Sequence, residues 1–156
     1  MEKFLENLLE AEKNIKNADH MIYVTFPLIK DKRILLKILE EIKNGVLYCI
    51  TSILQHDFVY KKINLYKNAK ENFNVFVQKS AQNYDITKDE IRMIRELLDL
   101  MEKHKQSPFE FIKGNKIIIL SNGLKPTILT LEKTKEFLML GKNLLKKTKE
   151  GFKRDL

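Results

Sequence analysis

The stretch from residue 116 to residue 130 reads KIIILSNGLKPTILT and has the strongest β pattern in the chain. Asn122-Gly123 is typical of a two-residue type I′ turn, because both positions accept a positive φ angle. The runs on either side of this turn are rich in isoleucine, which is typical of β-strands. We therefore expect a β-hairpin whose Ile-rich face packs against helices, since an isolated hairpin is marginal in water.

The two-residue turn would pair Ile117 with Ile128, and Ile119 with Pro126. Pro126 has no N–H to donate, so its strand is expected at an edge of the sheet. Lys113-Gly114-Asn115 is a second candidate turn, which would let residues 109–112 add a third strand. The region around 109–130 is therefore predicted to form a hairpin or a three-strand meander.

Elsewhere apolar residues recur at spacings of three and four, which is typical of helices with one buried face. The pattern predicts five helices, which lie at about 2–25, 31–60, 66–84, 87–105 and from 130 onward. The buried face of the first helix is expected to run through Ile22 to Thr25 and Ile29. Pro27 should end or kink this helix, because its ring lacks an N–H and disfavours helical geometry before it.

Start signals support three of these helices. Asp31 is a candidate N-cap of the second helix, and Thr130 is one of the last helix. Thr87 with Glu90 forms a capping box that opens the fourth helix. The fold class is therefore predicted as mainly α: one domain over 1–156, an up-and-down bundle of about five helices, with the small β-hairpin or meander inserted before the last helix.

Composition sets further bounds on the class of protein. With 156 residues, of which 44% are hydrophobic, the chain is long enough to bury its own core. The acidic start does not resemble a secretory signal, and no apolar run is long enough to cross a bilayer, so we expect a cytoplasmic protein. Cys49 is the only cysteine and lies in an apolar run, so a buried thiol is expected and a disulfide within the chain is excluded.

The positive charge is unevenly distributed. The net charge is +8; residues 1–60 hold 8 basic and 9 acidic side chains, and the remaining residues hold 21 and 12. Such asymmetry favours an anionic partner such as RNA, DNA or a lipid surface. A second interpretation is compositional bias, because 25 of the basic residues are Lys and only 4 are Arg, the residue that suits base recognition.

The last predicted helix has a lysine stripe at spacings of seven, four, three and four residues: Lys135, Lys142, Lys146, Lys149 and Lys153. Such a stripe could follow a phosphate backbone, with each Lys making a salt-sensitive contact. The alternative is a solvated helix face whose lysine stems cover apolar surface.

Two polar segments are weak candidates for a catalytic site. The first, residues 18–31, contains His20 beside Asp19, and the second, residues 104–116, contains His104 and Glu110. If these segments meet in space, two imidazoles and two carboxylates would form a candidate site; otherwise they are ordinary helix ends and turns. His56 lies on a predicted buried face, where a hydrogen-bonded core histidine is the commoner interpretation.

Familiar catalytic and binding motifs do not occur in the sequence. HExxH, Cys/His clusters, the P-loop, GxGxxG and GxSxG are all missing, so no metal or cofactor is expected. The polar segments, the NG hairpin and the terminal TLEKTKEFL resemble small archaeal proteins of uncharacterised function. The bundle loosely resembles the HEPN group of helical proteins, many of which cleave RNA or accompany nucleotidyltransferases.

The HEPN resemblance implies a helical bundle that acts on RNA, but the Arg–His catalytic motif of that group is not matched. Arg92 and Arg95 precede His104 by twelve and nine positions, which is more than that motif allows. Our leading hypothesis is a non-catalytic module that contacts RNA or another polyanion through the basic C-terminal part. The alternatives are an enzyme acting on nucleic acid or nucleotides, HEPN-like or not, and a homodimeric protein-interaction module with an exposed strand edge.

Overall fold

The structure is a computed structural model that describes residues 2–107, 109–121 and 125–155. Within these ranges the chain forms five continuous helical segments and a three-stranded antiparallel sheet that precedes the last helix. The predicted fold class is confirmed, with the meander rather than the two-stranded hairpin. Two of the helical segments contain a π-helical turn, labelled η.

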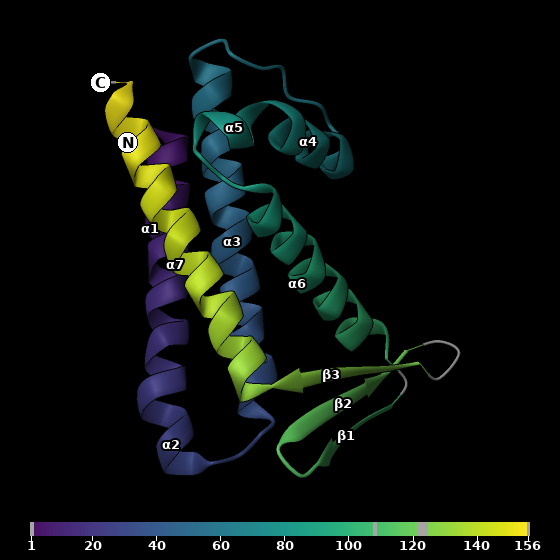
Figure 1. The fold of residues 1–156 in the computed structure, drawn as a ribbon. Helices are drawn as coiled ribbons and strands as arrows, with labels where there is room; N and C mark the ends of the chain where they lie inside the picture. Colours follow the sequence, from purple (N-terminus) through teal and green to yellow (C-terminus); the bar gives the residue numbers. More distant parts are fainter. Residues whose placement is uncertain (1, 108, 122–124, 156) are drawn as a thin grey trace.

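The bounds of the elements, in chain order, are α1 Lys3–His20, η1 Met21–Thr25, α2 Phe26–Ile29, α3 Ile34–Val59, α4 Ala69–Val75, η2 Phe76–Ser80, α5 Ala81–Asn83, α6 Lys88–Gln106, β1 Phe109–Lys113, β2 Lys116–Leu120, β3 Pro126–Thr130 and α7 Leu131–Arg154. The turn η1 continues α1 into α2, and η2 joins α4 to α5. The long helices α1, α3 and α7 run side by side, while α6 diverges from them toward the sheet (Figure 1).

The three long helices approach closely at one level of the core. Ile15 of α1 fills the space left by Gly45 of α3 and Gly141 of α7. A Cβ atom at Gly45 would lie 2.7 Å from Ile15 Cδ1, and one at Gly141 would lie 2.5 Å from the same atom. Because real Cβ contacts are longer, any larger residue at either glycine would force the Ile15 side chain or one of the helices to shift.

Pro27 does not end the first helical segment. The turn before it is π-helical, and Phe26 donates its N–H to the carbonyl of Met21, five residues earlier. This wider turn accommodates the proline ring, which would clash with a carbonyl in a regular α-helix. The predicted buried face is therefore wrong beyond Ile22: Phe26 is buried, whereas Ile29 is 58% exposed.

The predicted start signals are mostly confirmed. Thr87 Oγ1 accepts the N–H of Glu90 at 3.1 Å, and the Glu90 carboxylate accepts the N–H of Thr87 at 3.0 Å, which completes the capping box. Thr130 Oγ1 caps α7 by accepting a backbone N–H. The predicted N-cap at Asp31 is wrong, because α3 begins later, with Arg33 in the N-cap position.

The sheet has the order β1-β2-β3, and its inner face buries Ile117, Ile119 and Leu129. The Asn122-Gly123 turn lies outside the described residues, but the pairing around it differs from the prediction by one residue. The observed pairs are Ile117 with Leu129, Ile118 with Ile128, Ile119 with Thr127, and Leu120 with Pro126.

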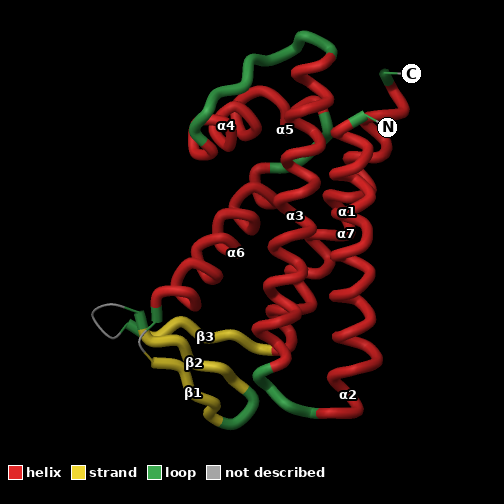
Figure 2. Tube along the Cα trace, turned by 180° about the vertical axis from the view of Figure 1, so that it is seen from behind, coloured by secondary structure: helices red, strands yellow, loops and turns green. Residues whose placement is uncertain are grey.

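The helical bundle has two distinct ends. The sheet and α2 lie at one end, whereas α4, α5 and the ends of α3 and α7 lie at the other (Figure 2). In the described part of the chain, every helix is either too short or too polar to cross a lipid bilayer.

Candidate functional site

The second predicted polar segment joins α6 to the sheet. His104 Nδ1 lies 2.6 Å from Glu110 Oε2, with side-chain exposures of 31% and 27%. Ser107 Oγ accepts the N–H of Phe109 at 3.1 Å and lies 2.7 Å from the carbonyl oxygen of Leu120, to which it can donate. These contacts fasten the first strand to the end of the helix.

His20 is not part of this group. It is exposed near the end of α1, and both ribbon views place α1 and α6 on opposite sides of α3 (Figures 1 and 2). The structure therefore does not bring His20 and His104 together. The neighbouring Asp19 instead binds Lys142 of α7, with 2.5 Å between Oδ1 and Nζ.

Part of the lysine stripe serves helix packing. Lys149 Nζ lies 3.3 Å from Glu12 Oε1 of α1, so that α1 and α7 share this ion pair as well as the one at Asp19. Partial burial raises the pKa of Glu12, but the ammonium groups of Lys149 and Lys16 outweigh it and hold the pKa below its ordinary value. The ammonium of Lys135 lies 5.5 Å from the ring centroid of Tyr23.

The other two lysines of the stripe differ from these three. Lys146 and Lys153 are exposed and form no ion pair with any described residue. They remain candidates for contact with an anion, whereas Lys142 and Lys149 would have to leave a partner on α1 first.

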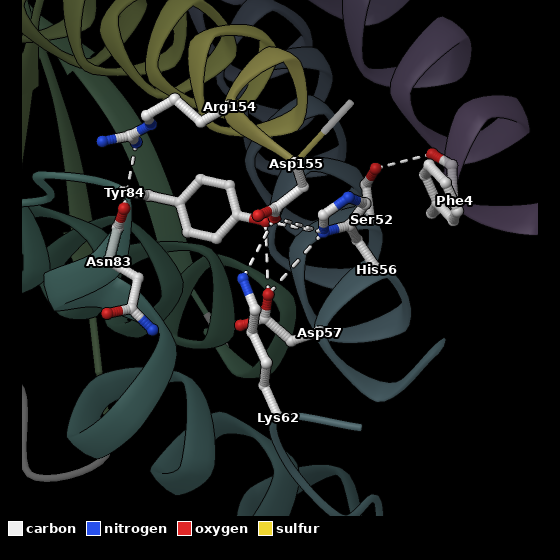
Figure 3. Close-up of polar contacts among 9 residues, drawn as sticks. All are labelled: Phe4, Ser52, His56, Asp57, Lys62, Asn83, Tyr84, Arg154 and Asp155. Atoms are coloured by element: carbon white, nitrogen blue, oxygen red, sulfur yellow. Dashed lines mark hydrogen bonds and ion pairs between the residues drawn. The ribbon is translucent and has the colours of Figure 1, made fainter. Parts of the chain in front are cut away.

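A buried polar group at the end of α3 was not predicted beyond its histidine. We call it the His56 cluster; it consists of His56, Asp57, Tyr84 and Asp155 (Figure 3). The Tyr84 hydroxyl lies 3.1 Å from His56 Nδ1 and 3.3 Å from Asp57 Oδ1. Because a carboxylate only accepts, Tyr84 donates to Asp57 and its oxygen can accept from His56.

Aromatic rings enclose the imidazole of His56. Phe152 of α7 stacks on it with centroids 4.3 Å apart and an interplanar angle of 21°, and Phe4 of α1 meets it edge-on at 4.8 Å. Burial lowers the pKa of His56, against the opposing effect of the carboxylates of Asp155 and Asp57. Burial, reinforced by the Asp57 carboxylate, raises the pKa of Tyr84 far above its ordinary value.

The cluster is closed at the surface by Asp155. Asp155 Oδ2 lies 3.8 Å from His56 Nδ1 and 3.0 Å from Lys62 Nζ. His56 is only 2% exposed and Asp57 is fully buried, and Asp57 Oδ2 has no hydrogen-bond partner among the described residues. The cluster therefore holds the ends of α3, α5 and α7 together, and no substrate can reach its imidazole in this conformation.

Cys49 is a buried thiol, as predicted. It is 1% exposed, and burial raises its pKa to about 12. A thiol in this environment stays protonated at neutral pH and is a poor nucleophile.

A basic and aromatic surface begins directly after the cluster. Residues 58–79 contain five lysines and a single acidic residue, Glu71. The exposed aromatic side chains are Phe58 at 50%, Tyr60 at 46% and Tyr66 at 51%. We call this surface, together with the nearby end of α7, the basic pole; its basic residues are Lys61, Lys62, Lys67, Lys70, Lys79, Lys153 and Arg154.

The basic pole has an open hollow of about 600 Å³. Phe58, Val59 and Ile63 supply its apolar lining, and Lys61, Lys62 and Lys79 also line it. Lys62 is paired with Asp155, whereas the other lysines of residues 58–79 form no ion pair with a described residue. The hollow therefore combines a stacking surface with unneutralised positive charge.

Sequence reasoning missed this surface, although the signal was present. The stretch FVYKKINLYKNAK alternates aromatic residues with lysines, from Phe58 to Lys70. Tyr60 and Tyr66 fall within the predicted helices at 31–60 and 66–84, but the chain from Lys61 to Asn68 is not helical, and Tyr66 is exposed.

We compared the chain with known proteins in three ways. No protein-family model, no curated protein and no solved structure matches the chain.

Proposed function

We propose that the protein is a non-catalytic binding module that contacts single-stranded RNA, or another polyanion of the same chemistry, through the basic pole. The observation that carries this proposal is the hollow in which Phe58 lies beside Lys61 and Lys79. Proteins that hold single strands without base readout combine lysines along the backbone with aromatic rings on which bases stack.

The pattern of ion pairs supports this location. Lys142 and Lys149 of the stripe are engaged by acidic residues of α1, so their charge is partly neutralised within the protein. By contrast, the segment of residues 58–79 contains five lysines and only one acidic residue. Electrostatic attraction to phosphates is therefore expected to be strongest at the basic pole, with Lys153 contributing from the end of α7.

The composition of the surface also indicates the type of recognition. Lysine contacts phosphate as a point charge, and arginine is the usual residue for bidentate contacts to bases. Since all four arginines lie in ion pairs or on a ring of the protein itself, we expect binding that tolerates many sequences. Cleavage is not part of the proposal, because the buried imidazole of His56 lies behind Asp155.

The test is a titration of a fluorescently labelled single-stranded RNA at several salt concentrations. The double variant Lys61→Glu/Lys79→Glu should weaken binding at least about tenfold at low salt and reduce the slope of log affinity against log salt by about 1.4. The matched control is Lys13→Glu/Lys37→Glu, which reverses two exposed charges on α1 and α3. Equal losses in both variants, or no binding by the native chain at low salt, would refute the proposal.

A second pair of variants separates stacking from charge. Phe58→Ala should weaken binding between about fivefold and a hundredfold without changing the salt slope, because a stacked base is worth about 1–3 kcal/mol. Phe58→Tyr keeps an aromatic face and should bind like the native chain. The stripe variant Lys135→Glu/Lys146→Glu tests the alternative surface on α7, because both residues are exposed and lie outside the basic pole; a loss larger than that of Lys61→Glu/Lys79→Glu would move the interface there.

A further inference from the structure

The two edges of the small sheet differ. The β3 edge contains Pro126, which has no N–H to offer, and β3 leads directly into α7. The β1 edge is unpaired in the described part of the chain, and all five residues from Phe109 to Lys113 are exposed. Natural proteins usually protect such an edge with proline, a bulge or a covering helix, because it is a template for another strand.

The apolar side chains of β1 are exposed to solvent. Phe109 is 61% exposed and Phe111 is 39% exposed, and their rings contact each other on the outer face of the sheet, with centroids 6.4 Å apart. Ile112, on the opposite face, is 46% exposed. The charged Glu110 does not shield the edge, because its carboxylate is bound to His104.

The outer face of the sheet extends this apolar surface. The register places Phe111, Ile118 and Ile128 in one row across the three strands, and Ile128 is 48% exposed. At the same end of the molecule, Leu28 and Ile29 of α2 are 80% and 58% exposed (Figure 1).

The exposed apolar area at the sheet end is comparable to the apolar area that each partner buries in a standard protein–protein interface. With roughly 200 Å² for a complete aromatic side chain and somewhat less for Leu or Ile, these six residues, which lie on both faces of the sheet and on α2, together expose on the order of 550 Å² of apolar surface. A standard interface buries about 800 Å² per partner, of which about 450 Å² is apolar. The sheet end thus has enough apolar surface for one such interface.

We propose that two copies of this chain pair through β1, antiparallel and around a twofold axis at Phe111, to form a continuous six-stranded sheet. Antiparallel pairing at this register sets Phe111 opposite its own copy and Lys113 opposite Phe109 of the second copy. The lysines of the two β1–β2 turns then lie at opposite ends of the paired strands, so their charges do not meet. An isologous contact of this kind closes the assembly at two chains.

This dimer leaves the basic pole exposed, because the pole lies at the other end of the bundle (Figure 2). The proposal is therefore independent of RNA binding, and either can fail alone.

The first test is sedimentation velocity of the full chain from about 1 to 200 μM. The native chain should shift from monomer to dimer as concentration rises, and Phe111→Lys should weaken the dimer at least about 30-fold, because it places two ammonium groups face to face at the twofold axis. Phe58→Lys, an equally drastic change of an exposed aromatic residue at the other end, should dimerise normally. A native chain that stays monomeric at 200 μM, or a dimer that survives Phe111→Lys, would overturn the proposal.

The second test fixes the register. Opposed residues of antiparallel strands have Cα atoms about 4.5–5.5 Å apart, a distance that a disulfide can bridge. Phe111→Cys should therefore give a disulfide-linked dimer under mild oxidation, whereas Ile128→Cys, two strands away, should not. Native Cys49 does not interfere because it is buried. Crosslinking by Ile128→Cys but not by Phe111→Cys would show face-to-face stacking of the sheets and refute edge pairing.

Discussion

The two ends of the molecule place polar and apolar side chains in opposite ways. At the end where α3 finishes, His56 and Asp57 are buried and the surface is aromatic and basic. At the sheet end, the polar pair His104–Glu110 lies at the surface while Leu28 and Phe109 are strongly exposed. The first end is completed by contacts within one chain, whereas the second has apolar surface that nothing in the described chain covers.

The largest difference should appear when an aromatic ring is removed from each end. Phe152→Ala removes the ring that stacks on His56 and should lower the free energy of unfolding by about 3–4 kcal/mol. Phe111→Ala, at a position 39% exposed, should lower it by less than about 1 kcal/mol when measured at a concentration where the chain is monomeric. Urea unfolding followed by circular dichroism measures both. Equal losses would show that the two ends are similarly packed.

The next effect concerns the hydroxyl inside the His56 cluster. Tyr84→Phe leaves Asp57 Oδ1 without its donor and should cost about 1–3 kcal/mol, since a buried carboxylate then lacks a partner. Tyr66→Phe is the control, because Tyr66 is 51% exposed and its hydroxyl can bond to water. Thermal unfolding of both variants would decide the point, and an unchanged Tyr84→Phe would indicate that the hydroxyl is not the donor to Asp57.

The pH dependence of the free energy of unfolding should reveal the titration of the buried His56 imidazole. The unfolded chain titrates this residue near pH ~6.5, and burial lowers its pKa in the folded state. Below about pH 6.5 the unfolded state binds a proton that the folded state does not, so the free energy of unfolding should fall as the pH decreases from 7 toward 5. The loss should level off once the pH is below the folded pKa.

The variant His56→Gln removes this titration and should have a flatter stability profile over that interval. The matched variant is His20→Gln, because His20 is exposed on α1; it should keep the native slope. Parallel profiles for the native chain and His56→Gln would argue against a buried, uncharged imidazole.

The smallest effect is expected from the lysine stripe. A double-mutant cycle of Asp19→Ala and Lys142→Ala should give a coupling of about 0.5–1 kcal/mol, because the pair is partly exposed and screened by solvent. Lys146→Ala should leave stability unchanged, since Lys146 pairs with no described residue. A coupling near zero would mean that Lys142 does not contribute to the packing of α1 against α7.

Features that depend on a few neighbouring residues could be predicted from the sequence. The capping box of Thr87 and Glu90 needs only a spacing of three, and the cap at Thr130 needs only a hydroxyl before an apolar run. Both occur as expected. The third strand was also foreseeable, because a Gly-Asn turn separates two apolar runs.

Features that depend on turn geometry or on distant contacts could not be predicted from the sequence. The strand register differs by one residue from the pairing that a two-residue turn at Asn122-Gly123 implies: Leu120 pairs with Pro126, and Ser121 donates its N–H to the carbonyl of Lys125. The His56 cluster draws Tyr84 and Asp155 from positions 28 and 99 residues beyond His56. Local periodicity contains no information about such partners, so only the burial of His56 itself could be expected.

The π-helical turn at Met21–Thr25 determines how this chain should be aligned with any future relative. A π-helical turn contains one residue more than an α-helical turn, so it is equivalent to a single-residue insertion inside a helix. If the same residues formed α-helical turns throughout, everything that follows would be rotated by about 100° around the helix axis. A homologous helix without this turn would therefore superpose on α1, yet its sequence would need a one-residue gap before Pro27.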